Sequence, residues 1–484
     1  MLLTLMSFIL GFCPVCKTNG HSVCPIKPLI TVADTARPDS LHVVDYTVIR
    51  SIKITGNKKT KERIILRELD VKVGDSINNV QLDTTLLINR NKIFNTNLFI
   101  TVDLLLENRS GNQVDLHIKL KERWYFFPAP LFELVDRNFN EWWHQRNRDL
   151  SRVRYGIRLT QDNVFGLNQK LELLFLTGFV DQYSIGYKIP YIDRAQKTGL
   201  GFNVSYTQNK AIPYRTEDHQ LDFIDSEDVL RERFSAEISL RRRSKFYDFH
   251  TVKLSYSQTN LADTIAEINP LYFLDGKTKQ ELLKLEYIFE HNKTDINAYP
   301  LNGQVYKLEL VKYGLGVFNN VDMFGATFTM AKFKQLGRGF FVDGLLRGRY
   351  LMHQQQPYSI SRGLGYGNNF LRGYEFYVLD GQHYFLNRNT LKFRFINTKK
   401  ELGFIPIPQF RTMPLAMYLT LYFDTGYVSD RFFTETSNRF TNRLIYGTGV
   451  GLDIVTFYNM IIRCNYAINS DLEHGFYFSF SADL

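Results

Sequence analysis

Apolar and polar residues alternate along the chain from about residue 150 to its end, and no convincing long amphipathic helix interrupts them. Alternate residues of a β-strand point to opposite faces of a sheet, so each run predicts a strand with one apolar and one polar face. The clearest runs are residues 153–160, 200–207, 234–241, 306–310 and 476–484. The pattern predicts an antiparallel sheet over the C-terminal two thirds of the chain.

The preceding region has a different pattern. Residues 48–54 alternate as a strand, and Thr60 is placed to cap a helix that follows a Gly-Asn turn. A second run of apolar residues at helical spacing comes next, and two strands are expected at 98–106 and 114–120. The predicted order of strand, helix, helix, strand, strand describes a small α+β domain.

The first twelve residues are nearly all apolar, and their length fits the apolar region of a secretory signal better than a membrane-spanning helix. No later window approaches the roughly 20 apolar residues that such a helix needs. Three cysteines lie in or near this leader and only Cys464 lies in the body, which agrees with export. The predicted parts are a signal peptide at 1–24, a linker at 25–44, the α+β domain at 45–123 and a barrel at 124–484.

Composition narrows the class of sheet. A chain with mean hydropathy −0.22 and no helical span could cross a membrane only as a closed barrel, since barrels and helices alone satisfy every backbone group in lipid. The 39 Phe and 28 Tyr suit strands and interfacial girdles. A large soluble sandwich would share this composition. Behind an export signal we expect a mainly β fold, an antiparallel transmembrane barrel of about 16 strands.

Charge and motifs exclude several functions. The 59 Lys and Arg are interspersed with 49 Asp and Glu, which favours a polar lumen and loops over a nucleic-acid surface. The chain has no Gly-x-Ser-x-Gly motif, and its ten His are scattered without metal-ligand spacing. We therefore expect no enzyme, no catalytic residue, no cofactor, no metal site and no nucleic-acid partner.

Two short motifs carry the candidate chemistry. The first, which follows a glycine-rich stretch, is Leu371, Arg372, Gly373 and Tyr374. The second, on a predicted strand, is Phe423, Asp424 and Gly426. Alternation along that strand places Asp424 on its polar face, which would point into the lumen if the apolar face meets lipid.

An arginine–carboxylate pair can be bidentate, and glycines let a loop backbone turn tightly and approach the wall. We predict that Arg372 pairs with Asp424 and pins an internal loop. The alternatives are an ordinary flexible glycine loop, a solvated strand carboxylate, and a phosphate cradle. The cradle is the weakest of these because no helix pattern follows the glycines.

These features resemble known families. The α+β domain resembles a POTRA domain, and the two motifs with the Asp295–Gly303 segment resemble the barrel of the BamA/TamA-type outer-membrane assembly family. The resemblance implies an insertase or translocase of a Gram-negative outer membrane, with the POTRA-like domain in the periplasm. Such a domain would bind extended clients by adding them to a sheet edge. This chain departs from the family in having one POTRA-like unit, Leu371 before Arg-Gly, and a terminal Leu484.

The resemblance also implies a lateral seam where the first and last barrel strands meet and template client strands. We place it between Val153, Tyr155 and Ile157 on one side and Phe476, Phe478 and Phe480 on the other. The expected partners are unfolded outer-membrane or secreted client proteins, outer-membrane lipids and accessory lipoproteins. Two other functions share the fold: a dedicated secretion pore for one partner, and a passive or structural barrel that needs neither Arg372 nor Asp424.

Overall fold

The computed structural model describes most of the chain after residue 45. The described residues are 46–134, 147–150, 153–193, 195–318, 321–352, 355–367, 369–401, 403, 412–432, 439–456 and 460–481. The expected signal peptide and linker lie outside them.

The POTRA-like domain holds one mixed four-stranded sheet and two helices. Its elements are β1 (Tyr46–Thr55), α1 (Glu62–Leu66), β2 (Ser76–Asn78), α2 (Asn79–Phe94), β3 (Phe99–Ser110) and β4 (Gln113–Glu122). The strand order is β2-β1-β4-β3, with β1 parallel to β4 and the other neighbours antiparallel. The order agrees with the prediction except for β2, whose three residues are too few to show a periodic pattern.

The core of this domain is made by the helices and the sheet face they cover. Ile64, Ile65 and Ile93 from the helices pack with Leu116 and Ile118 of β4, each at most 2% exposed. The prediction that Thr60 caps α1 is wrong. Lys61 occupies the N-cap without a side-chain bond, and the Thr60 hydroxyl donates instead to Glu122 Oε1 at 2.7 Å. The short α1 therefore depends on the burial of its isoleucines.

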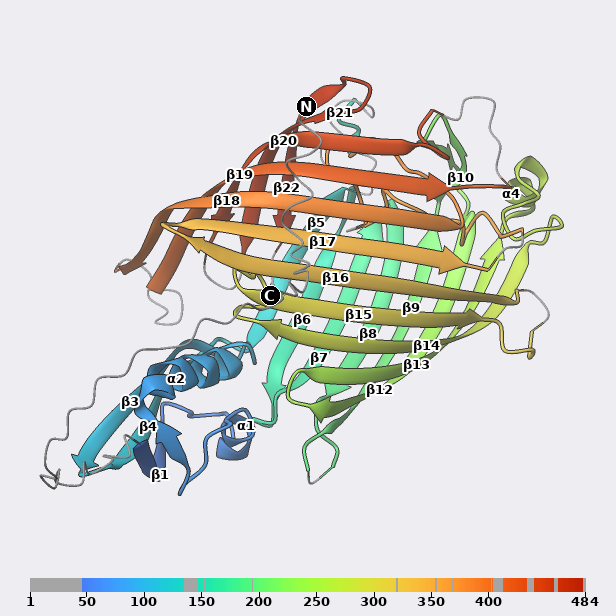
Figure 1. The fold of residues 1–484 in the computed structure, drawn as a ribbon. Coiled ribbons are helices and arrows are strands. Elements are labelled where there is room, and N and C mark those ends of the chain that lie inside the picture. The colour runs from blue at the N-terminus through green and yellow to red at the C-terminus, as the bar shows by residue number, and fades with distance from the viewer. Residues whose placement is uncertain are drawn as a thin grey trace, which may run out of the picture. The chain divides into compact units, whose positions relative to one another are not determined.

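Sixteen further strands form one antiparallel sheet in which each strand pairs with its neighbours in chain order (Figure 1). They are β5 (Phe126–Leu134), β6 (Val153–Val164), β7 (Gln169–Gly178), β8 (Val180–Ile189), β9 (Thr198–Asn209), β12 (Arg231–Lys245), β13 (Asp248–Leu261), β14 (Lys279–Thr294), β15 (Gly303–Tyr313), β16 (Met323–Gly337), β17 (Phe340–Leu351), β18 (His383–Glu401), β19 (Thr412–Ser429), β20 (Leu444–Val455), β21 (Ile461–Asn469) and β22 (His474–Ser481). The predicted mainly β barrel class and its strand number are confirmed. The strands β5 and β22 are the two edges of the sheet.

Connections differ between the two ends of the strands. At one end, called here the turn end, strands such as β16 and β17 are joined by tight turns. At the other, the loop end, several connections are longer, and two of them carry the hairpin β10 (Ala211–Glu217) and β11 (Gln220–Asp225) and the helix α4 (Asp263–Ile268). The segment 352–382 between β17 and β18, called here the internal loop, also starts from this end.

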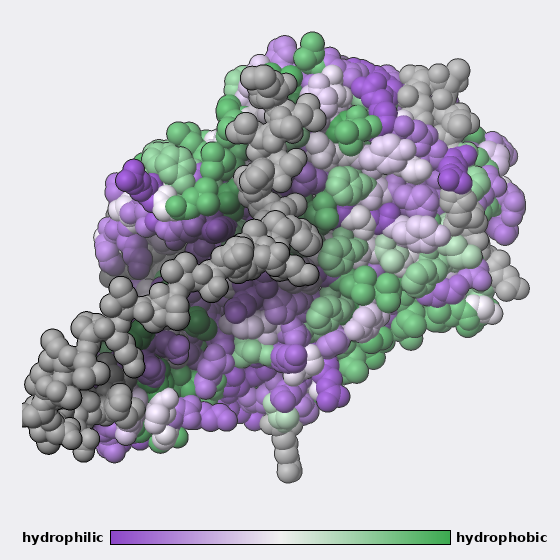
Figure 2. Space-filling view, viewed as in Figure 1, coloured by the Kyte–Doolittle hydropathy of each residue, from purple (hydrophilic) through white to green (hydrophobic). Residues whose placement is uncertain are grey.

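The outer face of the sheet is apolar. Large apolar side chains are exposed at alternate strand positions, for example Val204, Ile238, Leu254 and Leu421 at 40%, 44%, 39% and 54%. Figure 2 shows hydrophobic side chains gathered over the strands on the face in view. An apolar surface of this extent suits contact with lipid.

Among the helices of the described residues, none combines the length and the apolar character needed to cross a membrane.

A glycine at the end of β1 supplies a test of the POTRA-like fold. Gly56 has φ +91°, and a Cβ there would lie 1.9 Å from the Leu120 carbonyl oxygen, whereas Gly111 has φ +60° and open space. We expect Gly111→Ala to cost about 1 kcal/mol through backbone strain, and Gly56→Ala to cost about 3 kcal/mol or more because it adds a steric clash. Urea unfolding of residues 46–123 in the full chain, followed by proteolysis, measures both. Equal losses would contradict the close packing of β1 on β4.

Candidate functional site

Arg372 of the internal loop and Asp424 of β19 form a bidentate ion pair. Arg372 Nε donates to Asp424 Oδ2 at 2.7 Å, and Nη2 donates to Oδ1 at 2.6 Å. The Asp424 side chain is fully buried and that of Arg372 is 13% exposed. The structure thus brings together the two residues that the sequence pattern paired, although they are 52 positions apart.

Neighbouring side chains make further contacts with this ion pair. Arg372 Nη2 also donates to Thr390 Oγ1 at 3.2 Å, and the guanidinium lies 3.9 Å from the centre of the Tyr422 ring. Arg388, the cross-strand neighbour of Asp424, places its Nε 3.7 Å from Oδ2. A buried carboxylate is tolerated only when paired and hydrogen-bonded, and removing one partner of such a pair costs about 3–5 kcal/mol.

Glycines on the wall let the loop approach this closely. A Cβ on Gly447, which is the cross-strand neighbour of Asp424 on β20, would lie 1.9 Å from the Arg372 carbonyl oxygen. A Cβ on Gly426 would lie 2.8 Å from Leu371 Cδ1. Gly373 has φ +94°, a conformation that glycine adopts without strain. The glycines of both motifs therefore provide space for the loop and the turn within it.

The rest of the loop motif is buried in a small core at the loop end. Leu371 and Tyr374 are each 1% exposed and cluster with Phe440, from the connection between β19 and β20. The Tyr374 hydroxyl lies 2.6 Å from Ser470 Oγ, and its ring meets Phe440 edge-on at 5.1 Å. Phe423, by contrast, lies on the half-buried outer face, with its ring 6.2 Å from that of Tyr446.

His219, at the tip of the β10–β11 hairpin, contacts residues of this core and of the internal loop. Its carbonyl accepts from the Val378 N–H at 2.8 Å, and its Nε2 accepts from the Phe440 N–H at 3.0 Å. Burial lowers the pKa of His219, and the bond at Nε2 requires the neutral ring. No sequence pattern predicts this contact, because the tip of a hairpin has no periodicity.

A second attachment fills the lumen from the turn end. In the segment between β14 and β15, Asp295 Oδ1 accepts from the backbone of Ile296, Leu301 and Asn302 and shapes the turn. Tyr299 then reaches across to β20, where its hydroxyl donates to Asp453 Oδ2 at 2.7 Å. Tyr299 is 6% exposed, so this turn packs as a small core of its own.

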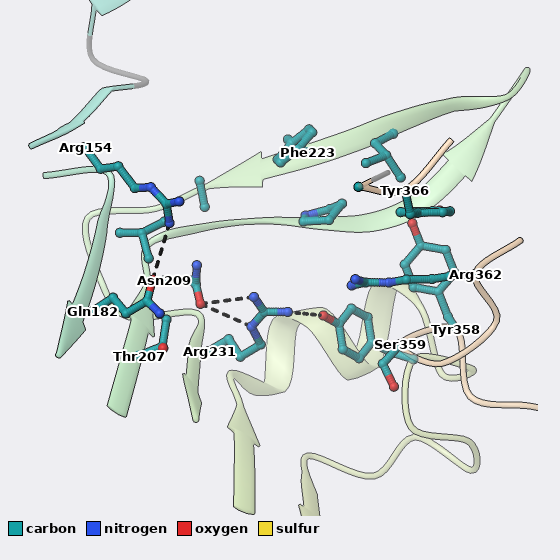
Figure 3. Close-up of a pocket in the computed structure, with 16 residues that line it drawn as sticks. Arg154, Gln182, Thr207, Asn209, Phe223, Arg231, Tyr358, Ser359, Arg362 and Tyr366 are labelled. Carbon is teal, nitrogen blue, oxygen red and sulfur yellow. Dashed lines mark hydrogen bonds between the residues drawn. The ribbon is translucent and has the colours of Figure 1, made fainter. Parts of the chain in front are cut away.

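A cavity of about 320 Å³ remains beside the internal loop (Figure 3). Wall strands, the β10–β11 hairpin and the internal loop line it, and Figure 3 shows Arg231 bonded to Asn209 and to a tyrosine hydroxyl. That hydroxyl belongs to Tyr272, at 3.1 Å from Nη1. Arg154 and Arg362 also line the cavity. The guanidinium groups of these three arginines border the space, and much of the remaining lining is apolar.

The part of the chain that the structure describes contains no group of three or more His, Cys, Asp or Glu placed to hold a metal ion. The interactions described in the lumen attach inserted segments to the barrel wall. Ion pairs, buried tyrosines and close backbone contacts hold an inserted loop against one part of the wall.

The seam requires a correction. The run with Val153, Tyr155 and Ile157 was expected to be the first barrel strand, but it forms β6, which pairs with β5 on one side and β7 on the other. The edge strand is β5. It contains Pro128 and Pro130, and because proline is disfavoured within central strands, its sequence does not predict a strand. Phe476, Phe478 and Phe480 do lie on the other edge strand, β22, and are 79%, 47% and 54% exposed.

The POTRA-like sheet has edges of unequal length. Its order places β2, with three residues, at one edge and β3, with twelve residues, at the other. An extended segment added to a sheet gains backbone hydrogen bonds in proportion to the length of the edge it meets. The β3 edge therefore offers the longer platform.

Gly447→Ala tests the loop attachment without changing any charge. The backbone at Gly447 is one that any residue adopts, so the added methyl should leave β20 intact and displace Arg372 by steric overlap. We expect amide exchange in residues 371–379 to accelerate at least about tenfold. The matched control is Gly348→Ala on β17, where a Cβ meets nothing nearer than 3.9 Å. Unchanged exchange in both variants would show that the loop does not rest on β20.

Acidic solution should loosen the contact at His219. Because its folded pKa lies below the unfolded value near 6.5, the contact is fully stable above that pH and weakens as the pH falls below it. We expect protease cleavage near residues 439–443 to increase between pH 7.5 and pH 5.5. A His219→Gln variant should lose most of this pH dependence, and an identical rise in that variant would assign the effect to another group.

Comparisons with known proteins agree with this architecture. A POTRA family model, described as a surface antigen variable number repeat, matches residues 47–123, and an Omp85 superfamily domain model matches residues 163–483. No curated protein matches the chain.

Several solved structures are similar at low identity. CdiB from Escherichia coli has a TM-score of 0.51 at 10% identity, covering 91% of this chain and 76% of that chain. BamA from Haemophilus ducreyi lacking POTRA domains 1–3 scores 0.49 at 15% identity, covering 90% and 84%. CdiB from Acinetobacter baumannii scores 0.48 at 16% identity, covering 90% and 73%. The likeness to the Escherichia coli protein supports the fold alone. Because the Omp85 model spans well over half of the sequence, this protein belongs to the Omp85 superfamily.

Proposed function

We propose that this protein is an outer-membrane insertase or translocase that assists the assembly or export of client proteins. Membership of the Omp85 superfamily supports a role of this kind in the outer membrane of a Gram-negative bacterium. The observation that carries the proposal is the buried Arg372–Asp424 pair, which holds the internal loop inside the barrel. A barrel built for passive diffusion has no need of such an attachment.

The contents of the lumen support this choice over a passive pore. An apolar core that includes Leu364, Leu371 and Tyr374 lies where an open channel would hold water. Porin lumens are polar and filled with water, so an apolar core at the loop end is a costly feature for simple permeation. A loop fixed against the wall instead shapes the inner surface beside strands that a client must pass.

The POTRA-like domain is proposed to receive clients in the periplasm. Its β3 edge is twelve residues long, and backbone pairing at such an edge gives affinity without selecting a sequence. Leu105, on β3, is 40% exposed and provides an apolar contact beside the edge. Unfolded outer-membrane or secreted chains are the partners that fit, with outer-membrane lipids around the barrel and accessory lipoproteins as further partners.

No nucleotide chemistry is part of this proposal. The free energy would come from the client, whose apolar strand faces leave water for lipid at about 25 cal/mol per Å² of buried surface. The protein would lower the kinetic barrier to client insertion, by offering strand edges and an ordered lumen. It would leave the equilibrium between the unfolded and the inserted client unchanged.

A charge-swap test in cells examines the proposal. Arg372→Glu or Asp424→Arg alone should reduce surface-protein levels several-fold and raise detergent sensitivity, because each leaves like charges buried together. The double swap should recover only in part, because Arg388 would lie beside the new arginine. The exposed pair Arg215 and Asp222 on the hairpin, swapped in the same way, is the control and should behave like wild type.

The same experiment separates the rival functions. Wild-type behaviour of all three variants would reject the proposal and favour a passive or structural barrel. Loss of one secreted protein, with other surface proteins and detergent resistance unchanged, would identify a dedicated secretion pore instead.

A further inference from the structure

The cavity beside the internal loop has three arginines in its lining and no acidic side chain. Arg154 comes from β6, Arg231 from β12 and Arg362 from the internal loop, and Figure 3 shows the three side chains around one space. No aspartate or glutamate of the described residues lines this space. Three positive charges therefore border a volume of about 320 Å³ whose wall contains no carboxylate.

The hydrogen bonds of Arg231 orient its guanidinium without neutralising it. Nε and Nη2 both donate to the side-chain oxygen of Asn209, at 3.2 and 3.1 Å, and Nη1 donates to the Tyr272 hydroxyl at 3.1 Å. Both acceptors are uncharged, and a guanidinium has more N–H groups than these bonds use. Arg231 is therefore held in place with its charge and some of its donors still unmatched.

The Arg362 side chain has no hydrogen bond or ion pair to the described residues, and its guanidinium lies 5.3 Å from the centre of the Tyr366 ring. The Asp380 carboxylate attracts it from beyond ion-pair distance and does not line the cavity. The oxygens of Asp380 accept hydrogen bonds from the Tyr366 and Thr216 hydroxyls, each at 2.6 Å. Asp380 thus fixes the tyrosine beside Arg362 and leaves the guanidinium available to another acceptor.

A further arginine adds to the positive charge at this place. Arg233 follows Arg231 at the next position on the same face of β12, and it is close enough to Arg231 and Arg362 to be repelled by both. Like charges gathered in a confined lumen create a potential that attracts ions of the opposite sign. An anion between these guanidinium groups would remove the repulsion.

The remaining lining suits the body of a small ring-shaped ligand. Phe223 and Tyr358 contribute aromatic rings, and the buried Ser359 hydroxyl oxygen has no hydrogen-bond partner among the described residues. Small-molecule sites combine an apolar or aromatic lining with a few polar groups, in volumes of roughly 300–1,000 Å³. This cavity lies at the small end of that range, which fits one sugar ring with its phosphate better than a polypeptide segment.

We propose that this cavity binds the phosphate group of a small phosphorylated sugar. Guanidinium groups donate paired, charge-assisted hydrogen bonds to phosphate oxygens, and the aromatic side chains would pack against the sugar ring. An occupant would connect the internal loop, through Arg362, to the wall strand that carries Arg231. This site goes beyond the proposed function, which requires no ligand in the lumen.

The same chemistry has two sources, a soluble sugar phosphate and the phosphorylated headgroup of an outer-membrane glycolipid. The strand β5 follows the POTRA-like domain and starts at the turn end, where Phe126 pairs with Gln161. A periplasmic POTRA-like domain therefore places the loop end, and this cavity with it, on the outer side of the membrane. Either source can reach a site in that position.

Calorimetric titration of the purified full chain in phosphatidylcholine nanodiscs tests the assignment. The probes are glucose 6-phosphate, inorganic phosphate and glucose. We expect glucose 6-phosphate to bind with a Kd of about 1 mM or tighter. Inorganic phosphate should bind at least about fivefold more weakly, because it lacks the ring that contacts the aromatic lining. Glucose should give no saturable heat at the same concentrations.

Arginine variants locate the site. Arg362→Gln and Arg231→Gln should each weaken glucose 6-phosphate binding at least about tenfold. Arg362→Gln breaks no hydrogen bond of the described residues, so its loss of binding cannot be ascribed to misfolding. Arg241→Gln is the matched control, because it removes the same charge from the same face of β12 outside the cavity. The ligand should slow amide exchange in residues 356–367 in the wild type and in this control only.

Nanodiscs that also contain lipopolysaccharide distinguish the two sources. Weaker binding of glucose 6-phosphate in those discs, by at least about tenfold, would identify the glycolipid headgroup as the occupant. Undiminished binding would identify a soluble sugar phosphate. Unchanged affinity in Arg362→Gln overturns the inference, and so does glucose 6-phosphate binding no tighter than inorganic phosphate. The charge-swap assay still measures the insertase role separately, because it changes neither Arg231 nor Arg362.

Discussion

The buried ion pair between Arg372 and Asp424 is the interaction on which the interior of this barrel depends. A carboxylate without solvent access stays charged only when it is paired and hydrogen-bonded, and Arg372 of the internal loop makes a bidentate contact with Asp424. The remaining features follow from that requirement. Gly426 and Gly447 give the loop room at the wall, and the buried Tyr374 fixes the turn that follows. The loop-end core of the barrel interior is thus organised around one neutralised charge.

Much of this was accessible from sequence, because strand periodicity assigns faces. Alternation along β19 placed Asp424 inward and Phe423 outward, and burial agrees for both. The expected number of about 16 strands follows from the length of the C-terminal region divided by the length of one strand and its turn. A pairing between a loop arginine and a wall aspartate could be proposed because one side of each strand must be polar inside a barrel.

The parts that could not be predicted lack a periodic pattern or depend on distant contacts. The strand β5 escaped recognition because two prolines argue against a strand until its partner is known. His219 and Phe440 meet through loop ends 221 positions apart, and Tyr299 reaches Asp453 across 154 positions. Thr60 is a residue type that often caps helices, but its hydroxyl donates to Glu122 instead of serving the helix. Local rules fail where tertiary partners offer a better bond.

The positions of the two lumen attachments have a mechanical consequence. Asp424 lies on β19 and Asp453 on β20, so both the internal loop and the β14–β15 turn are fastened to neighbouring strands of the C-terminal half. The strands β6, β8 and β9 border the cavity instead. The buried charged attachments therefore lie on β19 and β20, whereas the internal loop reaches the N-terminal strands through the β10–β11 hairpin, where the His219 carbonyl accepts from the Val378 N–H. A widening of the barrel that keeps both buried attachments would have to change the spacing of strands other than β19 and β20.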